Sequence, residues 1–291
     1  MRQEYSVQIK GKDYALGQRT WLMGVLNVTP DSFSDGGLYF SKKNAVRRGL
    51  QLIEDGADIL DVGGESSRPG SNPISAEEEK KRVLPVISEI RKHTDAFISV
   101  DTTKSEVLRS ALDEGADILN DISGMRFDPK ILEEASERDI PIVMMHMKGT
   151  PKNMQNKPWY KNTVDEIKAF LKKRVKTALN KGVKKNKIII DPGIGFGKRL
   201  EDNLEIIRNL GSFNELDLPI LIGVSRKSFL GSLLNTTPDQ RIEGTIASSL
   251  ISIVQGAHIL RVHDVAPLKK AVVVADAIMI EKGKDKVLDA R

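Results

Sequence analysis

The chain of 291 residues contains no cysteine, and only 5% of its residues are aromatic. The absence of cysteine excludes disulfides, thiolate metal sites and cysteine nucleophiles, which fits a reducing cytoplasm. Sparse aromatic residues disfavour a β-sandwich and a base-stacking platform for nucleic acid. No run approaches the roughly 18 apolar residues that span a bilayer, and the polar start, MRQEYSVQIKGKDYALG, has no signal-peptide core. We therefore expect a soluble, cytoplasmic protein with no membrane partner.

The net charge of +5 could indicate a nucleic-acid partner, but its distribution favours another interpretation. Lysines concentrate in KAFLKKRVKTALNKGVKKNK, residues 168–187. Their spacing leaves Phe170, Leu171, Val175 and Leu179 on one helical face, so the lysines form the solvated face of an amphipathic helix. We expect no nucleic-acid partner.

Short apolar runs alternate with longer helical segments along the whole chain, and no Pro- or Ser-rich stretch separates domains. The period of the apolar residues predicts strands at 22–28, 58–63, 97–101, 117–121, 141–146, 187–193, 219–224 and 258–263. Helical segments include 42–55, 75–93, 104–114, 163–181, 239–255 and 266–282. Ser75 before AEEE, and Asp165 with Glu166, are helix-start signals.

Eight strand-then-helix units predict an α/β protein of the (β/α)8 TIM-barrel class, which typically needs about 250 residues. A doubly wound open sheet is the alternative, but it usually has fewer strands, and no G-x-G-x-x-G follows the first strand here. Residues 1–19 predict a short N-terminal hairpin at the barrel's bottom, with Gly11-Lys12-Asp13 as its turn. We expect one domain over 1–291, with the barrel over 20–291.

In such a barrel the active-site residues come from the carboxyl ends of the strands and from the loops that follow. A random set of strand ends would include more small and apolar residues. The strand ends of this chain are Asn27, Asp61, Asp101, Asn120-Asp121, His146, Asp191, Ser225-Arg226-Lys227, Arg261 and His263. Their joint polar character predicts a site at this end of the barrel.

Several of these residues have a purely structural alternative. Asp101 precedes Thr-Thr-Lys and could cap the next helix. Asp191 is followed by Pro-Gly with no helix start nearby, which favours a site role. His146 could belong to the site or simply bond its own loop. His93, at a helix end, and His258, before a strand, are predicted to be structural.

The polar strand ends divide into chemical sets. Asp101, Asn120 and Asp191 can accept hydrogen bonds from a flat heterocycle rich in N–H groups. A cationic set suits an anionic, phosphorylated group, since Arg supplies planar paired donors. Its members are Arg68, Lys227, Arg261 and His263. Asn27 and Asp35 offer hard oxygen ligands that Mg²⁺ accepts. The sequence thus predicts a heterocyclic diphosphate bound with Mg²⁺.

Two loops are candidates for lids over this site. In LMGVLNVTPDSFSDGG, residues 22–37, an apolar run stops at Asn27 and a polar loop with one aromatic residue follows. The second loop, GGESSRPGSNP at 63–73, is rich in Gly, Ser and Pro. A simple turn does not need this combination of polar, charged and aromatic side chains, so the loops are expected to have a functional role.

Segments along most of the chain resemble the dihydropteroate synthase family, in the family's order. They are LMGVLNVTPDSFSDGG, GADILDVGGESSRPG, SVDTTKSEV, LNDISG, MMHMKGTPKNMQ, IIIDPGIGFGK, GVSRKSFLG and RVHDV. One departure is Ser67 before Arg68-Pro69, where the family more often has Thr, also a hydroxyl residue. The resemblance runs from about Thr20 to the end of the chain and implies a Mg²⁺-dependent (β/α)8 barrel, usually a homodimer.

The resemblance implies the following reaction and roles. 6-Hydroxymethyl-7,8-dihydropterin diphosphate and p-aminobenzoate would give 7,8-dihydropteroate and diphosphate. The pterin would be held by Asp101, Asn120, Ile122, Met145, Asp191, Gly223, Lys227 and Arg261, and the diphosphate by Asn27, Arg68, Arg261 and His263. Phe33, Ser67, Pro69, Phe196, Lys227 and Ser228 would frame the p-aminobenzoate pocket, and Asn27 and Asp35 would lie at the metal. Phe33 would cover the arylamine, and Asp35 would meet the metal on lid closure.

The catalytic residues implied are Asp35, Asp101, Lys227 and Arg261. The resemblance implies C–O cleavage first and arylamine attack second, and no residue is obviously paired with a base for covalent catalysis. Two alternatives remain: a pterin-dependent methyltransferase domain, which needs no diphosphate site, and a non-catalytic pterin-binding scaffold. The diphosphate residues argue against the first, and the presence of Arg68 and Lys227 argues against the second.

Overall fold

Eight parallel strands form the central sheet of the computed structural model, which describes residues 2–29 and 37–279. They are β3 (Trp21–Asn27), β4 (Ile59–Gly63), β5 (Phe97–Asp101), β6 (Ile118–Asp121), β7 (Ile142–Met145), β8 (Ile188–Asp191), β9 (Leu221–Ile222) and β10 (Ile259–Val262). Their order is β8-β7-β6-β5-β4-β3-β10-β9, and a parallel bridge between Ile190 and Ile220 links the two ends. The barrel is nearly closed, so the predicted (β/α)8 class is confirmed.

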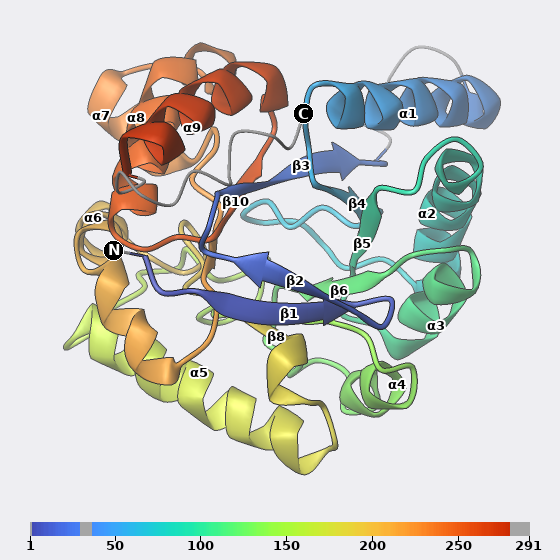
Figure 1. The fold of residues 1–291 in the computed structure, drawn as a ribbon, viewed down its shortest axis with the longest axis horizontal. Helices are drawn as coiled ribbons and strands as arrows, with labels where there is room; N and C mark the ends of the chain where they lie inside the picture. Colours follow the sequence, from blue (N-terminus) through green and yellow to red (C-terminus); the bar gives the residue numbers. More distant parts are fainter. Residues whose placement is uncertain (1, 30–36, 280–291) are drawn as a thin grey trace.

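Helices surround this barrel on its outside (Figure 1). They are α1 (Gly37–Glu54), α2 (Ala76–Arg91), α3 (Ser105–Asp113), α4 (Ile131–Glu137), α5 (Thr163–Asn180), α6 (Leu200–Arg208), α7 (Ser228–Leu234), α8 (Ile242–Val254) and α9 (Val265–Met279), with short 3₁₀ helices η2 (Lys185–Lys187), η3 (Leu210–Leu216) and η4 (Pro238–Gln240). The helix predicted over 239–255 is interrupted at Arg241, whose guanidinium donates to the carbonyls of Thr236 and Arg226.

Of the two predicted helix-start signals, only Ser75 provides a side-chain cap. The Ser75 hydroxyl accepts the backbone N–H of Glu78, which caps α2 as predicted. Helix α5 is capped instead by Asn162, one residue before the helix, and Asp165 lies within its first turn. Asp101 caps nothing, because the first N–H of α3 donates to Asp128 Oδ2 at 2.7 Å. The structural alternative for Asp101 is therefore wrong.

The N-terminal hairpin is present, with β1 (Tyr5–Ile9) antiparallel to β2 (Lys12–Leu16). Its turn residues are Lys10 and Gly11, with φ of 50° and 72°. The turn predicted at Gly11-Lys12-Asp13 is thus one residue too late. A two-residue turn with two positive φ values matches the twist of the flanking strands better than a longer one.

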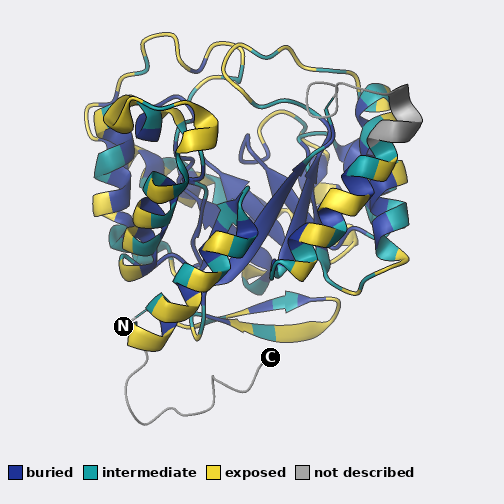
Figure 2. Ribbon diagram, turned by 90° about the horizontal axis from the view of Figure 1, so that it is seen from above, coloured by how far each residue is buried: buried dark blue, intermediate teal, exposed yellow. Residues whose placement is uncertain are grey.

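The hairpin closes the amino-terminal end of the barrel, and the long strand-to-helix loops lie at the other end (Figure 2). Its apolar side chains form one buried cluster with the first inward-facing layer of the barrel. This cluster comprises Val7, Ile9, Leu16, Trp21, Met23, Ile59, Ile118, Val143, Ile189, Leu221 and Ile259. An opening for a ligand is therefore left at the carboxyl end. None of the described helices is long and apolar enough to cross a membrane, and the cytoplasmic location stays a prediction.

Candidate active site

Strand alternation brings the predicted polar residues into the barrel. Side chains two positions apart on a strand share a face, so the residue two places after each apolar bottom-layer residue also points inward. From Ile59, Ile118, Ile189, Leu221 and Ile259 the next inward residues are Asp61, Asn120, Asp191, Gly223 and Arg261. Asp101 follows by register, because it pairs with Gly63 on one side and Asn120 on the other. A polar layer therefore lies directly above the apolar plug.

One recess at this end gathers most of the predicted pterin residues. It is lined by Asn120, Ile122, Met145, Asp191, Ile194, Phe196, Gly223, Ser225, Lys227, Arg261 and His263. A second recess shares Ile122 and is lined by Asp101 and Ser67. Thus seven of the eight predicted pterin residues line the first recess, and Asp101 lines the adjoining one.

Arg261 joins two carboxylates at the centre of the site. Its Nε donates to Asp61 Oδ2 at 2.7 Å, and its Nη2 donates to Asp101 Oδ2 at 2.8 Å. Asn120 Nδ2 also donates to Asp61 Oδ2, at 3.0 Å. Burial opposes the charge of Arg261, but Asp61 and Asp101 outweigh it and raise the pKa. Burial raises the pKa of Asp101, while Arg261 counteracts this.

Asp61 is a site residue that the sequence interpretation left without a role. It is fully buried, and its Oδ1 has no hydrogen-bond partner in the part of the chain that the structure describes. An unpaired buried carboxylate oxygen is costly, and the other oxygen of Asp61 holds both Asn120 and Arg261 at the site. Its position at the end of the second predicted strand was the available signal, but no ligand role was assigned to it.

Asp191 and Lys227 are buried site groups of opposite charge whose pKa values are both shifted. Asp191 Oδ1 accepts the Gly193 N–H at 2.6 Å. Burial raises the pKa of Asp191 to about 6, although Gly193 and nearby cations counteract the shift. Burial and Arg261 lower the pKa of Lys227 to about 8. Desolvated groups with shifted pKa values in a recess are typical of functional sites.

A strained residue positions Lys227. Arg226 has φ of 58°, a left-handed conformation that costs a side-chain-bearing residue roughly 1–2 kcal/mol. It is held there by Asp264, with N–O distances of 2.9 and 2.5 Å, and by its N–H to the Thr245 hydroxyl. Lys227 follows as the N-cap residue of α7, and its Nζ lies 4.0 Å from the centroid of the Phe196 ring.

The predicted diphosphate residues are only partly brought together. Asn27 and His263 line one cavity beside α1, and Arg261 lies in the recess with His263. Burial lowers the pKa of His263 to about 3, and its Nδ1 contacts the Ser225 hydroxyl at 3.0 Å. Burial therefore favours the neutral form of His263, and its place in the predicted cationic set stays a prediction. Arg68 is exposed on the loop after β4 and lines none of these recesses.

The p-aminobenzoate residues are likewise divided. Phe196 and Lys227 contact each other in the recess. Ser67 lines the recess of Asp101, whereas Pro69 and Ser228 are exposed. The loop of Ser67 and Pro69 is tied down at its far end, where the Gly70 N–H donates to the carbonyl of Pro151 at 3.0 Å. Phe33 and Asp35, with the lid predicted around them, lie outside the described residues.

The structure shows the contacts of the three histidines that the sequence left undecided or predicted to be structural. His258 is buried, accepting the Ile220 N–H through Nδ1 and contacting the Gln3 carbonyl through Nε2, so its structural role is confirmed. His93 lies at the surface beside Glu89. His146 is buried and contacts Lys198 Nζ through Nδ1 at 3.0 Å. It bonds the loop after β8 rather than its own loop.

A barrel with a layer of carboxylates, amides and cations above an apolar floor is the frame of a pterin-binding enzyme, and the family model described as "Pterin binding enzyme" matches residues 23–263. The dihydropteroate synthase of Escherichia coli (strain K12) is 44% identical over 261 residues, 90% of this chain and 92% of that protein. The chain belongs to the dihydropteroate synthase family.

Solved structures agree with this assignment over nearly the whole chain. The dihydropteroate synthase of Xanthomonas albilineans with 4-aminobenzoic acid is 41% identical, with a TM-score of 0.89 over 96% of this chain and 100% of that one. The same enzyme in complex with 7,8-dihydropteroate is 40% identical, with a TM-score of 0.83 over 92% and 97% of the two chains. The predicted family, fold class and transferase activity are confirmed.

Proposed function

We propose that this dihydropteroate synthase binds the pterin ring in the recess between β6 and β10. The observation that carries this proposal is the polar layer of Asp61, Asn120, Asp191 and Arg261 above a sealed apolar floor. A pterin edge alternates N–H donors with ring-nitrogen and carbonyl acceptors. Carboxylates can accept from the donors, and amide and cationic groups can donate to the acceptors. Ile122, Met145 and Gly223 leave a flat, partly apolar space for the ring.

The two carboxylates on Arg261 favour a role in charge stabilisation. The reaction breaks the C–O bond to diphosphate, the oxygen keeps the electron pair, and the pterin carbon becomes electron-poor. Asp101 lines the adjoining recess, where Arg261 favours its charged form, and a negative charge there stabilises the developing cation. The arylamine nitrogen then forms the C–N bond and loses a proton. No covalent intermediate with the protein is needed.

The departing diphosphate would be bound by Asn27, Arg68, Arg261 and His263. In support, Asn27 and His263 line the same cavity and Arg261 lies beside His263. The neutral His263 can donate one ring N–H, and a nearby diphosphate would raise its pKa and favour the charged form. Arg68 is exposed on the β4–α2 loop, from which it would have to reach the diphosphate.

The p-aminobenzoate would lie against Phe196, Lys227 and the loop residues Ser67 and Pro69. The Phe196 ring supplies an apolar face, and the Lys227 ammonium above it supplies charge. Ser228 begins α7 directly after Lys227, on the exposed side of the same turn. Phe33 would complete the pocket from outside the described residues.

The cofactor proposed is Mg²⁺, bound through Asn27 and Asp35. Mg²⁺ prefers hard oxygen ligands and usually takes one or two from the protein, with the rest from water and phosphate. In the described residues no group of three His, Cys, Asp or Glu side chains could hold a metal. The Asn27 amide fits a metal shared with the diphosphate better than a protein-only site. Bound Mg²⁺ would neutralise charge on the leaving diphosphate.

A single assay tests this function. Purified protein, Mg²⁺, the pterin diphosphate and p-aminobenzoate are mixed, and dihydropteroate and diphosphate are both measured. We expect the two products in equal amounts. If pterin bound but neither product formed, the chain would be a non-catalytic scaffold, and methyl transfer without diphosphate release would indicate a methyltransferase domain. The identity to synthases along 90% of the chain favours the first outcome.

We also propose that two chains form a homodimer through α7, α8 and α9. Helix α8 packs against both α7 and α9, so the three present one continuous surface. Large apolar side chains are exposed on it: Leu233, Leu234, Ile251, Val254, Val273, Val274 and Ile278. An apolar patch of this size on one face is typical of a protein interface.

A further inference from the structure

A lysine buried beside the active site has only uncharged hydrogen-bond partners. Lys198, in the loop between β8 and α6, is 3% exposed. Its Nζ contacts His146 Nδ1 at 3.0 Å and donates to the carbonyls of Phe196 and His146 at 3.1 and 3.5 Å. Among the described residues it forms no ion pair. A lysine is rarely enclosed without a carboxylate, so this position calls for an explanation beyond burial.

His146 is the matching acceptor at the end of β7. It is buried, and burial together with Lys198 lowers its pKa well below the usual value, so the ring is neutral and Nδ1 can accept a hydrogen bond. Its backbone N–H donates to the Asp191 carbonyl at 2.9 Å. The ring meets Phe170 edge-on at 4.8 Å. The acceptor is therefore fixed to the barrel itself.

The loop that carries Lys198 is pressed against the loop after β7. At Gly193 a Cβ atom would lie 1.9 Å from the His146 carbonyl oxygen, so only glycine permits this approach. Gly195 accepts from Gln155 Nε2 at 2.7 Å, and Gly197 accepts from the Tyr160 hydroxyl at 2.8 Å. The loop is thus held from outside by these two side chains and from inside by Lys198.

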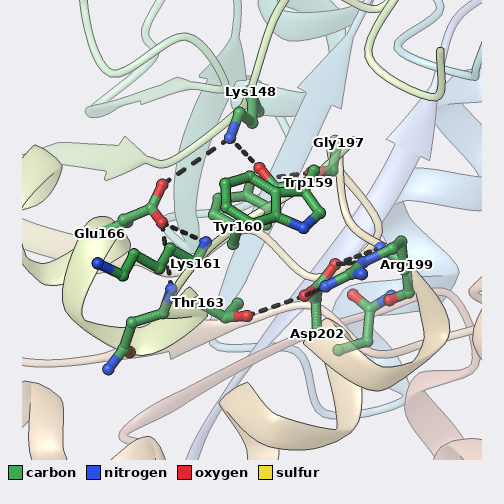
Figure 3. A network of polar contacts seen from close by, with 11 residues as sticks. Lys148, Trp159, Tyr160, Lys161, Thr163, Glu166, Gly197, Arg199 and Asp202 are labelled. Carbon is green, nitrogen blue, oxygen red and sulfur yellow. Dashed lines mark hydrogen bonds and ion pairs between the residues drawn. The ribbon is translucent and has the colours of Figure 1, made fainter. Parts of the chain in front are cut away.

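Figure 3 shows the outer half of this arrangement. Lys148 lies 4.0 Å above the Tyr160 ring, and the Tyr160 hydroxyl points to Gly197. Just beyond, Arg199 is paired with Asp202, which also accepts from the Thr163 hydroxyl at 2.8 Å. The residues on both sides of Lys198 are therefore anchored.

Between the anchors lies Phe196, whose ring forms one wall of the site. It is 7% exposed and packs with Ile122, Met145, Met147 and Met154. Its carbonyl is the one that Lys198 holds, and its ring lies under Lys227 Nζ. A shift of this carbonyl would therefore move both the ring and the ammonium that rests on it.

We propose that Lys198, acting with His146, is a positioning residue that fixes Phe196 and thereby Lys227 for the second substrate. The proposal deepens the proposed function, since it rests on p-aminobenzoate binding against Phe196. Lys198 touches neither substrate in this arrangement. Its three hydrogen bonds fix the position of the Phe196 wall. It donates no hydrogen bond to Asn120, Asp191 or Arg261, although its charge acts on Asp191.

The test compares Lys198→Met with His146→Leu, His146→Asn and the double variant Lys198→Met/His146→Leu. The methionine keeps the stem and removes the donors. The asparagine keeps an acceptor near the Nδ1 position, and leucine does not. Lys161→Met is the control, because Lys161 is exposed and lies beside the same network. Each protein is measured for kcat, for KM of both substrates, and for calorimetric binding of pterin and of p-aminobenzoate to the pterin-loaded protein.

We expect Lys198→Met to raise KM and Kd for p-aminobenzoate about tenfold, because small misplacements of a binding wall are costly. Pterin affinity should fall less than p-aminobenzoate affinity, since Lys198 hydrogen-bonds to no pterin residue and acts only on the charge of Asp191. His146→Leu should act in the same direction, His146→Asn should restore most of the affinity, and the double variant should be no worse than Lys198→Met. Lys161→Met should match the wild type.

Unchanged p-aminobenzoate binding in Lys198→Met would overturn the proposal. So would an equal loss for both substrates, which a purely structural role predicts. If Lys198→Met does not fold, Lys198→Gln and His146→Leu are judged by the same criteria. A wild type that binds both ligands and makes no dihydropteroate would sink the proposed function and leave the positioning test valid. A wild type that binds no p-aminobenzoate would overturn both.

Discussion

At the residue scale, the centre of the site is a hydrogen-bonded network of charged and polar side chains. Arg261 lies between Asp61 and Asp101, and Asn120 completes the contacts of Asp61. Each group therefore has a role that depends on its neighbours, and removing one changes the charge of the others. We therefore expect substitutions here to change binding and turnover by different amounts.

Asp101→Asn is expected to reduce kcat about 100-fold, because it removes a fixed charge that stabilises the pterin cation in the transition state. Diphosphate affinity should change little, since Asp101 lies outside the cavity of Asn27 and His263. Steady-state kinetics and diphosphate calorimetry measure the two effects. Asp165→Asn, at an exposed position on α5, is the control. A nearly normal kcat would show that Asp101 has no such role.

Asp61→Leu is expected to lower the free energy of unfolding by about 3 kcal/mol or more, because it leaves a buried arginine with one carboxylate in place of two. Pterin affinity should fall with it, since Asp61 holds Arg261 and Asn120, which line the recess. Urea unfolding and pterin calorimetry measure these effects. Asp61→Asn should recover much of the stability but not the affinity. Full pterin binding by the leucine variant would contradict the role given to Asp61.

At the scale of elements, the hairpin is joined to the barrel by a histidine. His258 precedes β10, accepts the N–H of Ile220 before β9, and contacts the carbonyl of Gln3 before β1. Since Nδ1 is the acceptor, the ring must be neutral there, and Nε2 donates to Gln3. Burial lowers the pKa of His258 to about 4.

This contact makes the hairpin end of the barrel sensitive to acid. Between about pH 6.5 and 4 the unfolded chain binds a proton at His258 that the folded chain does not, so stability falls as the pH falls through this window. The loss from this one group approaches about 3 kcal/mol at pH 4. Urea titrations of the wild type and His258→Gln measure it. The variant, being uncharged at every pH, should show a flatter dependence, and equal slopes would refute the assignment.

The strands and helices also show which parts of the fold can be predicted from sequence patterns. Every predicted strand is present within a few residues, because each is an apolar run bounded by turn signals. The prediction was wrong at the hairpin turn and at Arg241, where a left-handed pair and a set of carbonyl contacts from Arg241 decide the geometry. Such features depend on partners that local periodicity does not encode.

At the scale of the whole molecule, the exposed apolar face of α7, α8 and α9 determines the expected assembly. We expect light scattering to give the mass of two chains. Val254→Asp combined with Val274→Asp should give single chains with an unchanged circular dichroism spectrum, because charges at a buried interface are costly. Both residues are more than half exposed in one chain. Lys176→Asp on exposed α5 is the control, and a dimer that survives both charges would place the interface elsewhere.

The sequence by itself determined the barrel, the family and the polar strand ends, because alternating apolar runs and long specific motifs are local in the chain. Only the tertiary structure decided which polar groups pair with one another and which are desolvated. It made Asp61 the partner of Arg261, kept His263 neutral, and enclosed Lys198 beside His146. These outcomes depend on burial and on contacts between residues far apart in sequence. Local composition does not show which side chains lose their water in the folded protein.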